Sequence, residues 1–426
     1  MSCKDKLIDF INSSPDAYHA VENTKIRLIS EGYTEISEYD LTAFCDGKPH
    51  FVIRGGSSLI AFRGKTDGGF MITASHSDSP AFKVKETQAL GSYVKLNTEK
   101  YGGMILYTWL DRPLSVSGRV TLRTSEGIAT RLVNIDRDYA VIPSVAIHLN
   151  RGVNDGYKFN PAVDMLPLVG ISGGSSILAD IAETLGVSSE DILSHDLYVY
   201  NRECGRTVGS KGELILSPRI DDLACAYAAL EGFLTSADSP RGVSVYAVFD
   251  NEEVGSSTKQ GANSTFLYDT LKKIAGDEGK YYAMLKDSYL VSCDVAHGKH
   301  PNHPELSDSV GAPVLGGGVA VKYNANQSYT TDSFSDGILR VVAERCGEKL
   351  QSFYSRADML CGSTLGSISD TRVSIPSVDI GIPQLAMHSS TETAAISDVD
   401  SMATLLRELY SSSLSTSEGE VKIIKG

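Results

Sequence analysis

Hydrophobic positions near the start of the chain recur with the spacing of amphipathic helices. Leu7, Phe10 and Ile11 are three and four residues apart, and the same spacing returns further along until Gly32. Residues spaced in this way share one face of a helix, and glycine commonly ends a helix. The pattern therefore predicts two helices within residues 1–31.

Short apolar runs that are typical of strands follow. The runs at 51–54 and 59–62 flank two glycines and predict a hairpin, while FMITA at 70–74 resembles a strand buried on both faces of a sheet. Helical and buried-strand patterns return at residues 223–233, 243–249, 290–293 and 378–382. We therefore predict an α/β fold with a central sheet flanked by helices.

The pattern changes to strict alternation between about residues 88 and 214. Val116 and Val120 point one way while Ser117 and Arg119 point the other, which is typical of half-buried strands. We interpret residues 88–214 as a β-rich domain inserted into an α/β domain made of residues 1–87 and 215–426. A last helix is predicted near 397–410, followed by a frayed tail at 411–426.

Composition limits the class of protein and its partners. The 426 residues are 42% hydrophobic and 22% charged, with no run of 18 uncharged apolar residues, so we expect a soluble, cytoplasmic protein and no membrane partner. Its 39 basic and 53 acidic residues give a net charge of −14, which disfavours nucleic acid. The seven scattered cysteines form no C-x-x-C pair, so neither disulfides nor a thiolate zinc site is expected.

Candidate chemistry is concentrated where the predicted strands end. Four segments, ITASHSDSP, VFDNEEVGSS, LVSCDVAHG and QLAMHSSTE, follow apolar strands, and SPRIDDLACA opens a helix. Ligands gather at the carboxyl ends of strands in open α/β sheets. The segments supply His76, Asp78, Asp221, Glu252, Glu253, Asp294 and His388. Imidazole and carboxylate are ligands that zinc, cobalt and manganese accept.

These residue types suit hydrolysis at a pair of metal ions. Two ions about 3.5–4 Å apart lower the pKa of a bridging water, with one carboxylate between them and another that takes the proton of the water. The adjacent Glu252 and Glu253 fit the roles of base and ligand. Asp78, two residues after His76, fits a carboxylate that orients a metal-bound imidazole.

At this point the sequence resembles a known family, the M18 metallo-aminopeptidases, over nearly its whole length. The resemblance is carried, in order, by SPDAYHAVE, SHSDSPAFKVK, TWLDRPLSVSGRV, SVAIHLNR, SPRIDDL, FDNEEVGSS, CDVAHGKHPNHP, KYNANQSY at 322–329 and MHSSTE. It implies a zinc-peptidase fold with an inserted dimerisation domain. It also implies release of N-terminal residues from short peptides.

The resemblance implies roles for individual residues. One metal would be bound by His76, Asp221 and Asp294, and the other by Asp221, Glu253 and His388, with Asp221 as the bridge. Glu252 would be the general base, Asp78 would orient His76, and the Asp221–Asp222 peptide bond would be cis. Two divalent ions per subunit follow, with zinc expected and cobalt or manganese as alternatives.

The resemblance also implies assembly into a tetrahedral dodecamer built from dimers. Within the insertion, His148 would reach the active site of a neighbouring subunit. From the residues alone, a histidine on this apolar stretch is more often a core residue, and only the resemblance makes the functional role equally well supported.

Substrate contacts are predicted at His297, Lys322 and Tyr329. The last two match family positions near the specificity pocket, where a buried ammonium would favour N-terminal Asp or Glu. An ordinary exposed lysine at 322 and a preference for leucine stay open at this point. So do two different functions: a dinuclear deacylase or dipeptidase of the same broad fold, and a scaffold without catalytic activity.

Overall fold

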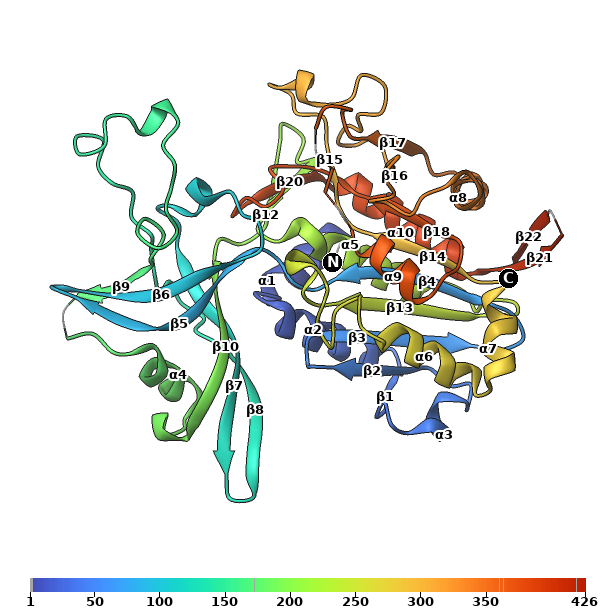
Figure 1. Ribbon diagram of the computed structural model, residues 1–426, viewed down its shortest axis with the longest axis horizontal. Helices are drawn as coiled ribbons and strands as arrows, with labels where there is room; N and C mark the ends of the chain where they lie inside the picture. Colours follow the sequence, from blue (N-terminus) through green and yellow to red (C-terminus); the bar gives the residue numbers. More distant parts are fainter. Residues whose placement is uncertain (1–2, 172, 360, 363, 419) are drawn as a thin grey trace.

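A nine-stranded mixed sheet forms the centre of the larger part of the molecule (Figure 1). The computed structural model describes residues 3–171, 173–359, 361–362, 364–418 and 420–426. The strands of this sheet are, in order, β1 (Thr34–Glu35), β2 (His50–Arg54), β3 (Ser58–Gly64), β13 (Val243–Phe249), β4 (Phe70–His76), β14 (Tyr289–Cys293), β18 (Ser377–Gly381), β16 (Val319–Tyr323) and β17 (Leu350–Tyr354). The hairpin β2–β3 and the buried strand β4 confirm the strand predictions.

Helices cover both faces of this sheet. One face packs against α1 (Cys3–Ser13), α2 (Ala17–Ser30), α5 (Ile220–Thr235), α8 (Ser333–Cys346) and α10 (Ile396–Tyr410). The other packs against α3 (Leu41–Phe44), α6 (Phe266–Ala275), α7 (Glu278–Leu285) and α9 (Leu365–Arg372). Neighbouring residues of β4 enter opposite cores, since Met71 faces the first group of helices and Ile72 the second. This explains why the central strands are continuous apolar runs.

The three central strands β13, β4 and β14 are neighbours and parallel. Phe249 pairs with His76, and Ser292 pairs with Ala74, so the three strands end at one edge of the sheet. Whatever follows each strand in the sequence is therefore brought to the same place.

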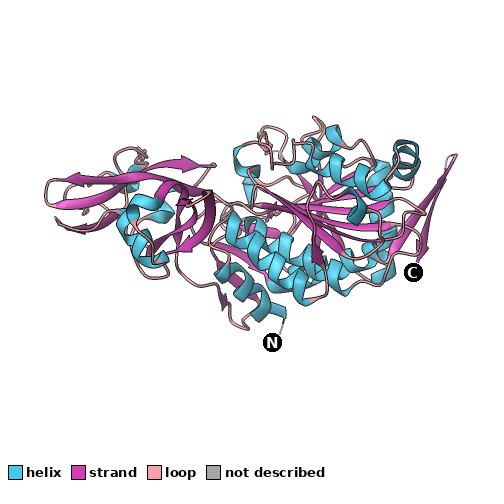
Figure 2. Ribbon diagram, turned by 90° about the horizontal axis from the view of Figure 1, so that it is seen from below, coloured by secondary structure: helices cyan, strands magenta, loops and turns pink. Residues whose placement is uncertain are grey.

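The smaller part is built on an antiparallel six-stranded sheet (Figures 1 and 2). Its order is β8 (Gly127–Asn134), β7 (Leu114–Thr124), β10 (Ile192–Asn201), β5 (Ala81–Leu90), β6 (Tyr93–Tyr101) and β9 (Leu168–Ile171), with α4 (Ile177–Leu185) packed on it. The strands of this sheet, here called the insertion sheet, span residues 81–201. The division into folding units at 88 and 214 stays a prediction.

A third sheet has five strands. It contains β11 (Arg206–Val208), β12 (Leu214–Ser217), β20 (Glu392–Ala395), β19 (Pro383–Leu385) and β15 (Ala296–His297). Short 3₁₀ helices are η1 (Leu106–Trp109), η2 (Val153–Asp155), η3 (Ser189–Asp191), η4 (Glu252–Val254) and η5 (Pro304–Leu306).

The prediction of a frayed C-terminal tail is wrong. Residues after α10 form the hairpin β21 (Ser412–Ser417) and β22 (Glu420–Lys425). Leu414 is buried, and Val421 and Ile423 pack against the core on the α5 face, so alternating apolar residues hold the segment in place.

Within the described residues, no helix is both long and apolar enough to cross a lipid bilayer.

Candidate active site

The five candidate ligands and the candidate base Glu252 come from five different segments of the chain. His76 is the last residue of β4, Asp294 directly follows β14, and Glu252 and Glu253 open η4 just after β13. Asp221 lies at the start of α5, and His388 lies in the loop between β19 and β20. The parallel arrangement of β13, β4 and β14 therefore accounts for four of these residues, and α5 and the third sheet supply the other two.

Asp221 lies between two histidines. Its Oδ1 is 3.2 Å from Nε2 of His76, and its Oδ2 is 3.2 Å from Nε2 of His388. The side chain is 4% exposed, and the Asp221–Asp222 peptide bond is cis, as the resemblance implied. A single carboxylate thus presents one oxygen to each of two groups of ligands.

Each group is completed by a further carboxylate. Asp294 Oδ1 is 3.8 Å from Nε2 of His76, while Glu253 Oε2 is 3.5 Å from Nε2 of His388. One donor atom from each of Asp221, Glu253 and His388 lies within 4.8 Å of the others, and the same holds for His76, Asp221, Asp222 and Asp294. The structure thus brings together all five residues that were predicted to bind metal.

The donor set fits divalent cations of the zinc type. It consists of imidazole nitrogens and carboxylate oxygens, which these ions accept when no thiolate is present. Oε1 of Glu253 is buried and has no hydrogen-bond partner among the residues that the structure describes. A lone buried carboxylate oxygen is costly unless a donor or cation faces it.

Electrostatics at the site also favours a bound cation. Burial raises the pKa of Glu253 well above its ordinary value, and the nearby charge of Asp221 adds to this shift. Burial likewise raises the pKa of Glu252 to about 7, with Asp294 and Asp78 adding to the shift against the charge of His76. Asp221 is the exception: burial opposes its ionisation, but the two imidazoles beside it, His388 and His76, outweigh burial and lower its pKa.

Backbone N–H groups of the candidate ligands are fixed by a second layer of buried carboxylates. Asp222 Oδ2 accepts from His76 N at 3.1 Å, and Asp78 Oδ2 accepts from Glu253 N at 3.2 Å. Glu392 accepts from two backbone groups, Asp221 N at 3.0 Å and His388 N at 2.8 Å. These contacts orient the main chain of the site, because each carboxylate satisfies a buried donor.

Asp78 lies behind His76, where the sequence predicts an orienting carboxylate. Nδ1 of His76 is 3.0 Å from the backbone oxygen of Asp78 and 3.4 Å from its Oδ1. The ring therefore directs Nε2 toward Asp221 and Asp294. The backbone carbonyl makes the closer contact, so the carboxylate of Asp78 is only part of what holds the imidazole.

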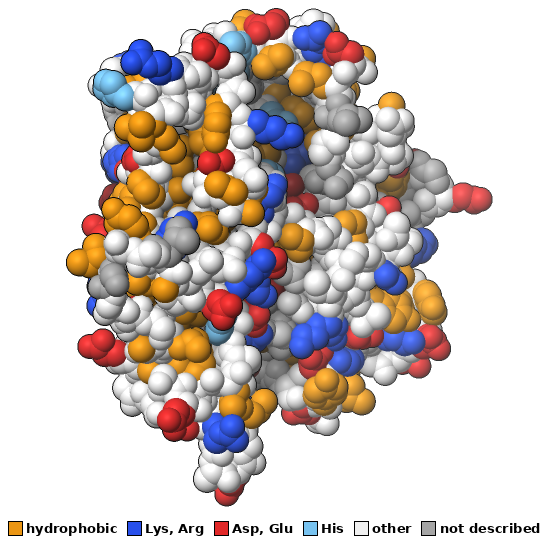
Figure 3. All heavy atoms as spheres, turned by 60° about the vertical axis from the view of Figure 1, so that its left-hand side comes forward, with side chains coloured by type: hydrophobic (Ala, Val, Ile, Leu, Met, Phe, Trp, Pro, Cys, Tyr) orange, Lys and Arg blue, Asp and Glu red, His pale blue; other side chains and the backbone are white. Residues whose placement is uncertain are grey.

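A cavity of about 320 Å³ opens beside the ligand cluster, and its lining includes His297, Lys322, Tyr329, Phe353 and Met387. Nζ of Lys322 is 3.4 Å from Asp294 Oδ2 and 5.4 Å from the centre of the Tyr329 ring. The interpretation as an exposed lysine is wrong, since Lys322 is 2% exposed. Burial opposes its charge, but Asp294 and Asp379 outweigh burial and raise its pKa. The face of the molecule drawn in Figure 3 is hollowed, and basic, acidic and histidine side chains gather at the hollow.

His148 lies apart from this cluster, in the long loop between β8 and η2. Its side chain is exposed, so the interpretation as a core histidine is wrong. Neighbouring Ile147 and Leu149 are also exposed, at 48% and 83%. Within one chain, His148 is not among the residues that line the cavity of the site.

Comparison with known proteins gives the family. A profile of the family described as Aminopeptidase I zinc metalloprotease (M18) matches residues 10–410. The chain belongs to the M18 family. It is therefore an aminopeptidase and a hydrolase, as the resemblance implied.

Individual relatives agree with this assignment. The chain is 41% identical over 425 residues to "Probable M18 family aminopeptidase 2" of Clostridium novyi, covering 95% of this chain and 98% of the relative. It resembles a chain in a cryo-EM structure of the Ape4 and Nbr1 complex, with a TM-score of 0.92, 32% identity, and coverage of 96% and 85%. In fold it also resembles the S. cerevisiae mApe1 dodecamer, with a TM-score of 0.83, 24% identity and 95% coverage of both chains. The zinc-peptidase fold is confirmed.

Sequence reasoning missed several residues that this M18 aminopeptidase places around the cluster. Glu392 stands within the MHSSTE segment, yet only its two backbone contacts reveal its position. Tyr101, the last residue of β6, donates its hydroxyl to Asp78 Oδ2 at 2.6 Å. Two glycines follow Tyr101, a pattern typical of a turn, and nothing in the sequence indicates that this turn faces the site.

Glu392 offers a test of the second layer. In Glu392→Gln an amide nitrogen would face a backbone N–H in place of a carboxylate oxygen, so Asp221 or His388 would lose its anchor. Removing such an outer partner costs roughly 10–100-fold in metal affinity. We expect zinc affinity, measured by competition with a chromogenic chelator, to fall by about that factor.

Asp398 provides a matched control, because its buried carboxylate also accepts two backbone N–H groups, from Gly316 at 2.7 Å and Gly318 at 2.9 Å. Asp398→Asn should lose thermal stability without losing zinc affinity. Equal zinc affinities in the two variants would contradict a role of Glu392 at the metal site.

Proposed function

We propose that this M18 aminopeptidase holds two zinc-type ions and removes N-terminal residues, with acidic ones preferred, from short peptides. One observation carries the proposal: Asp221 directs its two oxygens to two different histidines, each 3.2 Å away. His76 and Asp294 would complete one ion site, and Glu253 and His388 the other. Manganese and cobalt suit the same donors.

Bound ions of this kind supply Lewis acidity, which polarises the scissile carbonyl and lowers the pKa of a water. Glu252 would accept the proton of the attacking water and later donate it to the leaving amine. Its backbone N–H donates to Asp78 Oδ1 at 3.1 Å, which fixes the start of η4. Its side chain lines the cavity, where it can reach a substrate.

Lys322 supports the acidic preference. It is buried in the wall of the cavity with its ammonium turned toward Asp294, and a charge-assisted contact with a substrate carboxylate contributes about 1.5–3 kcal/mol. Asp294 already shares this charge, which weakens the preference. Phe353 and Met387 also line the cavity and would suit leucine, so a neutral preference is the competing candidate.

We also propose a homo-oligomer, a tetrahedral dodecamer built from dimers. The long loop that carries His148 exposes Val145, Ile147 and Leu149, at 48–83%, and Val163, beyond η2, is 67% exposed. Figure 3 shows the molecule from the side of the insertion sheet, and apolar side chains form patches on this face. Exposed apolar groups of this kind commonly mark contacts between proteins. A cytoplasmic location stays a prediction of the sequence.

The reaction is tested with Asp-, Glu-, Leu- and Lys-headed peptides and an N-acetylated control. We expect zinc-loaded protein to release the free N-terminal residue, with acetylation blocking release. Glu252→Gln should lower kcat by about 10²–10⁴-fold at unchanged zinc content, because only the proton carrier is removed. The control Glu278→Gln lies on the exposed surface of α7 and should match wild type. Equal activity of Glu252→Gln and wild type would contradict the role of Glu252.

Lys322→Met tests the specificity. Loss of the ammonium should reduce the ratio of kcat/KM for Asp- over Leu-headed peptides by about tenfold or more. Zinc content is measured alongside, because Lys322 also contacts Asp294. Lys83→Met, which removes an ion pair with Asp196 in the insertion sheet, is the control. An unchanged ratio would favour the neutral preference.

His148 is tested by complementation between inactive chains. If His148 acts in a neighbouring subunit, His148→Ala and Glu252→Gln should each be inactive alone. After mixing, dissociation and reassembly, about a quarter of the wild-type activity should return, since random pairing restores one site in four. No recovery in mixed particles of confirmed composition would contradict a role in trans.

A further inference from the structure

A short segment of the insertion touches the candidate metal site at three consecutive residues. Tyr101 ends β6, and Gly102 and Gly103 follow it before η1. Tyr101 donates to Asp78, Gly103 contacts His388, and Gly102 lies so close to Glu253 that an added Cβ would press on it. We call residues 101–103 the clamp.

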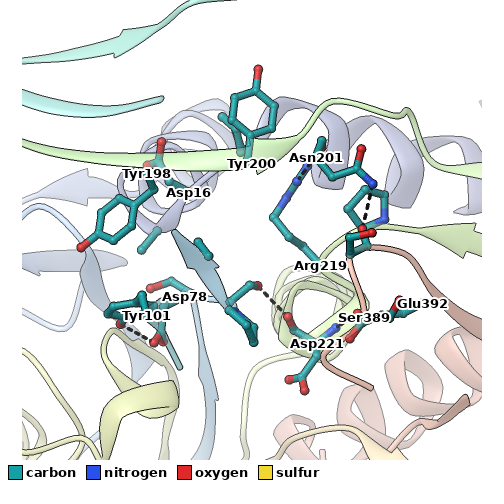
Figure 4. A pocket seen from close by; sticks show the side chains of 18 of the residues that line it. Asp16, Asp78, Tyr101, Tyr198, Tyr200, Asn201, Arg219, Asp221, Ser389 and Glu392 are labelled. Carbon is teal, nitrogen blue, oxygen red and sulfur yellow. Dashed lines mark hydrogen bonds between the residues drawn. The ribbon is translucent and has the colours of Figure 1, made fainter. Parts of the chain in front are cut away.

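Tyr101 fixes the carboxylate behind His76. Its hydroxyl donates to Asp78 Oδ2 at 2.6 Å and accepts from Asn251 Nδ2 at 2.9 Å. Figure 4 shows the Tyr101 ring beside Asp78 at one side of a cavity of about 40 Å³, where the insertion meets the larger part. Asp78 also accepts the backbone N–H groups of Glu252 and Glu253, so Tyr101 completes its set of donors.

Gly102 allows the clamp to lie directly on Glu253. Its φ is +78°, a conformation that glycine adopts without steric cost. A Cβ placed there would lie 3.1 Å from Glu253 Cβ and 3.3 Å from Glu253 Oε2. Any larger side chain would therefore push against a proposed metal ligand as well as strain the backbone.

Gly103 sets the tautomer of His388. Its carbonyl oxygen is 2.5 Å from Nδ1 of His388, and a carbonyl can only accept a hydrogen bond. Nδ1 must therefore carry a proton, which leaves the lone pair of Nε2 facing Asp221 and Glu253 in the neutral ring. Ile105 N donates to the backbone oxygen of His388 at 2.9 Å and holds the same loop.

We propose that the clamp is a positioning element through which the insertion orients Asp78, Glu253 and His388 for metal binding. This inference rests on the proposed function, because it takes these residues as part of the metal site. Metal affinity then depends on how the insertion docks on the larger part. The insertion contributes to its own chain's site as well as to assembly.

Two variants test the clamp, each with a matched control. Tyr101→Phe removes only the hydroxyl that donates to Asp78. Its control is Tyr198→Phe, which removes a hydroxyl from a ring whose centre is 5.4 Å from that of Tyr101 and which lines the same cavity. Gly102→Ala adds a methyl group against Glu253. Its control is Gly186→Ala, which adds a methyl group in the insertion at a φ of +65°, where an added Cβ has no neighbouring atom within 4 Å. Zinc affinity and stoichiometry are measured by chelator competition, and folding by the thermal midpoint of the metal-free proteins.

We expect Tyr101→Phe and Gly102→Ala to bind zinc about 10–100-fold more weakly than their controls, with metal-free midpoints similar within each pair. Raised zinc should restore much of the lost turnover of Tyr101→Phe. If wild type binds two ions and turns over peptides but Tyr101→Phe keeps the wild-type zinc affinity, the proposed role of the clamp is wrong and the proposed function stands. If wild type binds no zinc, both are overturned.

Discussion

Crowding of like charges in a buried place is the constraint on which the site depends. Asp221, Asp222 and Asp294 are each at most 9% exposed and lie next to one another. Burying an ion without a partner costs several kcal/mol, so such a cluster persists only with donors or cations around it. The two histidines and the backbone supply part of that compensation, and a divalent cation suits the remainder.

Backbone N–H groups of four candidate ligands compensate the buried carboxylates in the same way. The N–H groups of His76, Asp221, Glu253 and His388 each donate to a carboxylate of the outer layer, and the acceptors are Asp222, Glu392 and Asp78. Burial raises the pKa of Glu392 to about 8, and the charge of Asp221 adds to the shift. The same hydrogen bonds thus position the candidate ligands and satisfy buried backbone donors. Losing one of them would both destabilise the loop that carries a ligand and displace that ligand.

The insertion also supplies a hydrogen bond to this outer layer of carboxylates. Tyr101 at the end of its β6 donates to Asp78, Gly103 contacts His388, and Gly102 lies between them with no room for a Cβ beside Glu253. The larger part alone would therefore lack these neighbours of its own cluster. A segment whose sequence pattern predicts a separate β-rich module thus also lies against the candidate metal site.

The sequence by itself determined the fold class, the strands that end at the site, the family and the five candidate ligands that the structure gathers. Periodicity reports burial, and apolar strands followed by His, Asp or Glu mark a sheet edge, which gave the fold class and the strand ends. The resemblance to the M18 motifs gave the family and the set of five ligands. Only the tertiary structure decided the partners of Glu392 and Tyr101, the burial of Lys322 and the C-terminal hairpin. These depend on contacts between residues far apart in the chain, such as Tyr101 with Asn251, whose geometry leaves no local pattern.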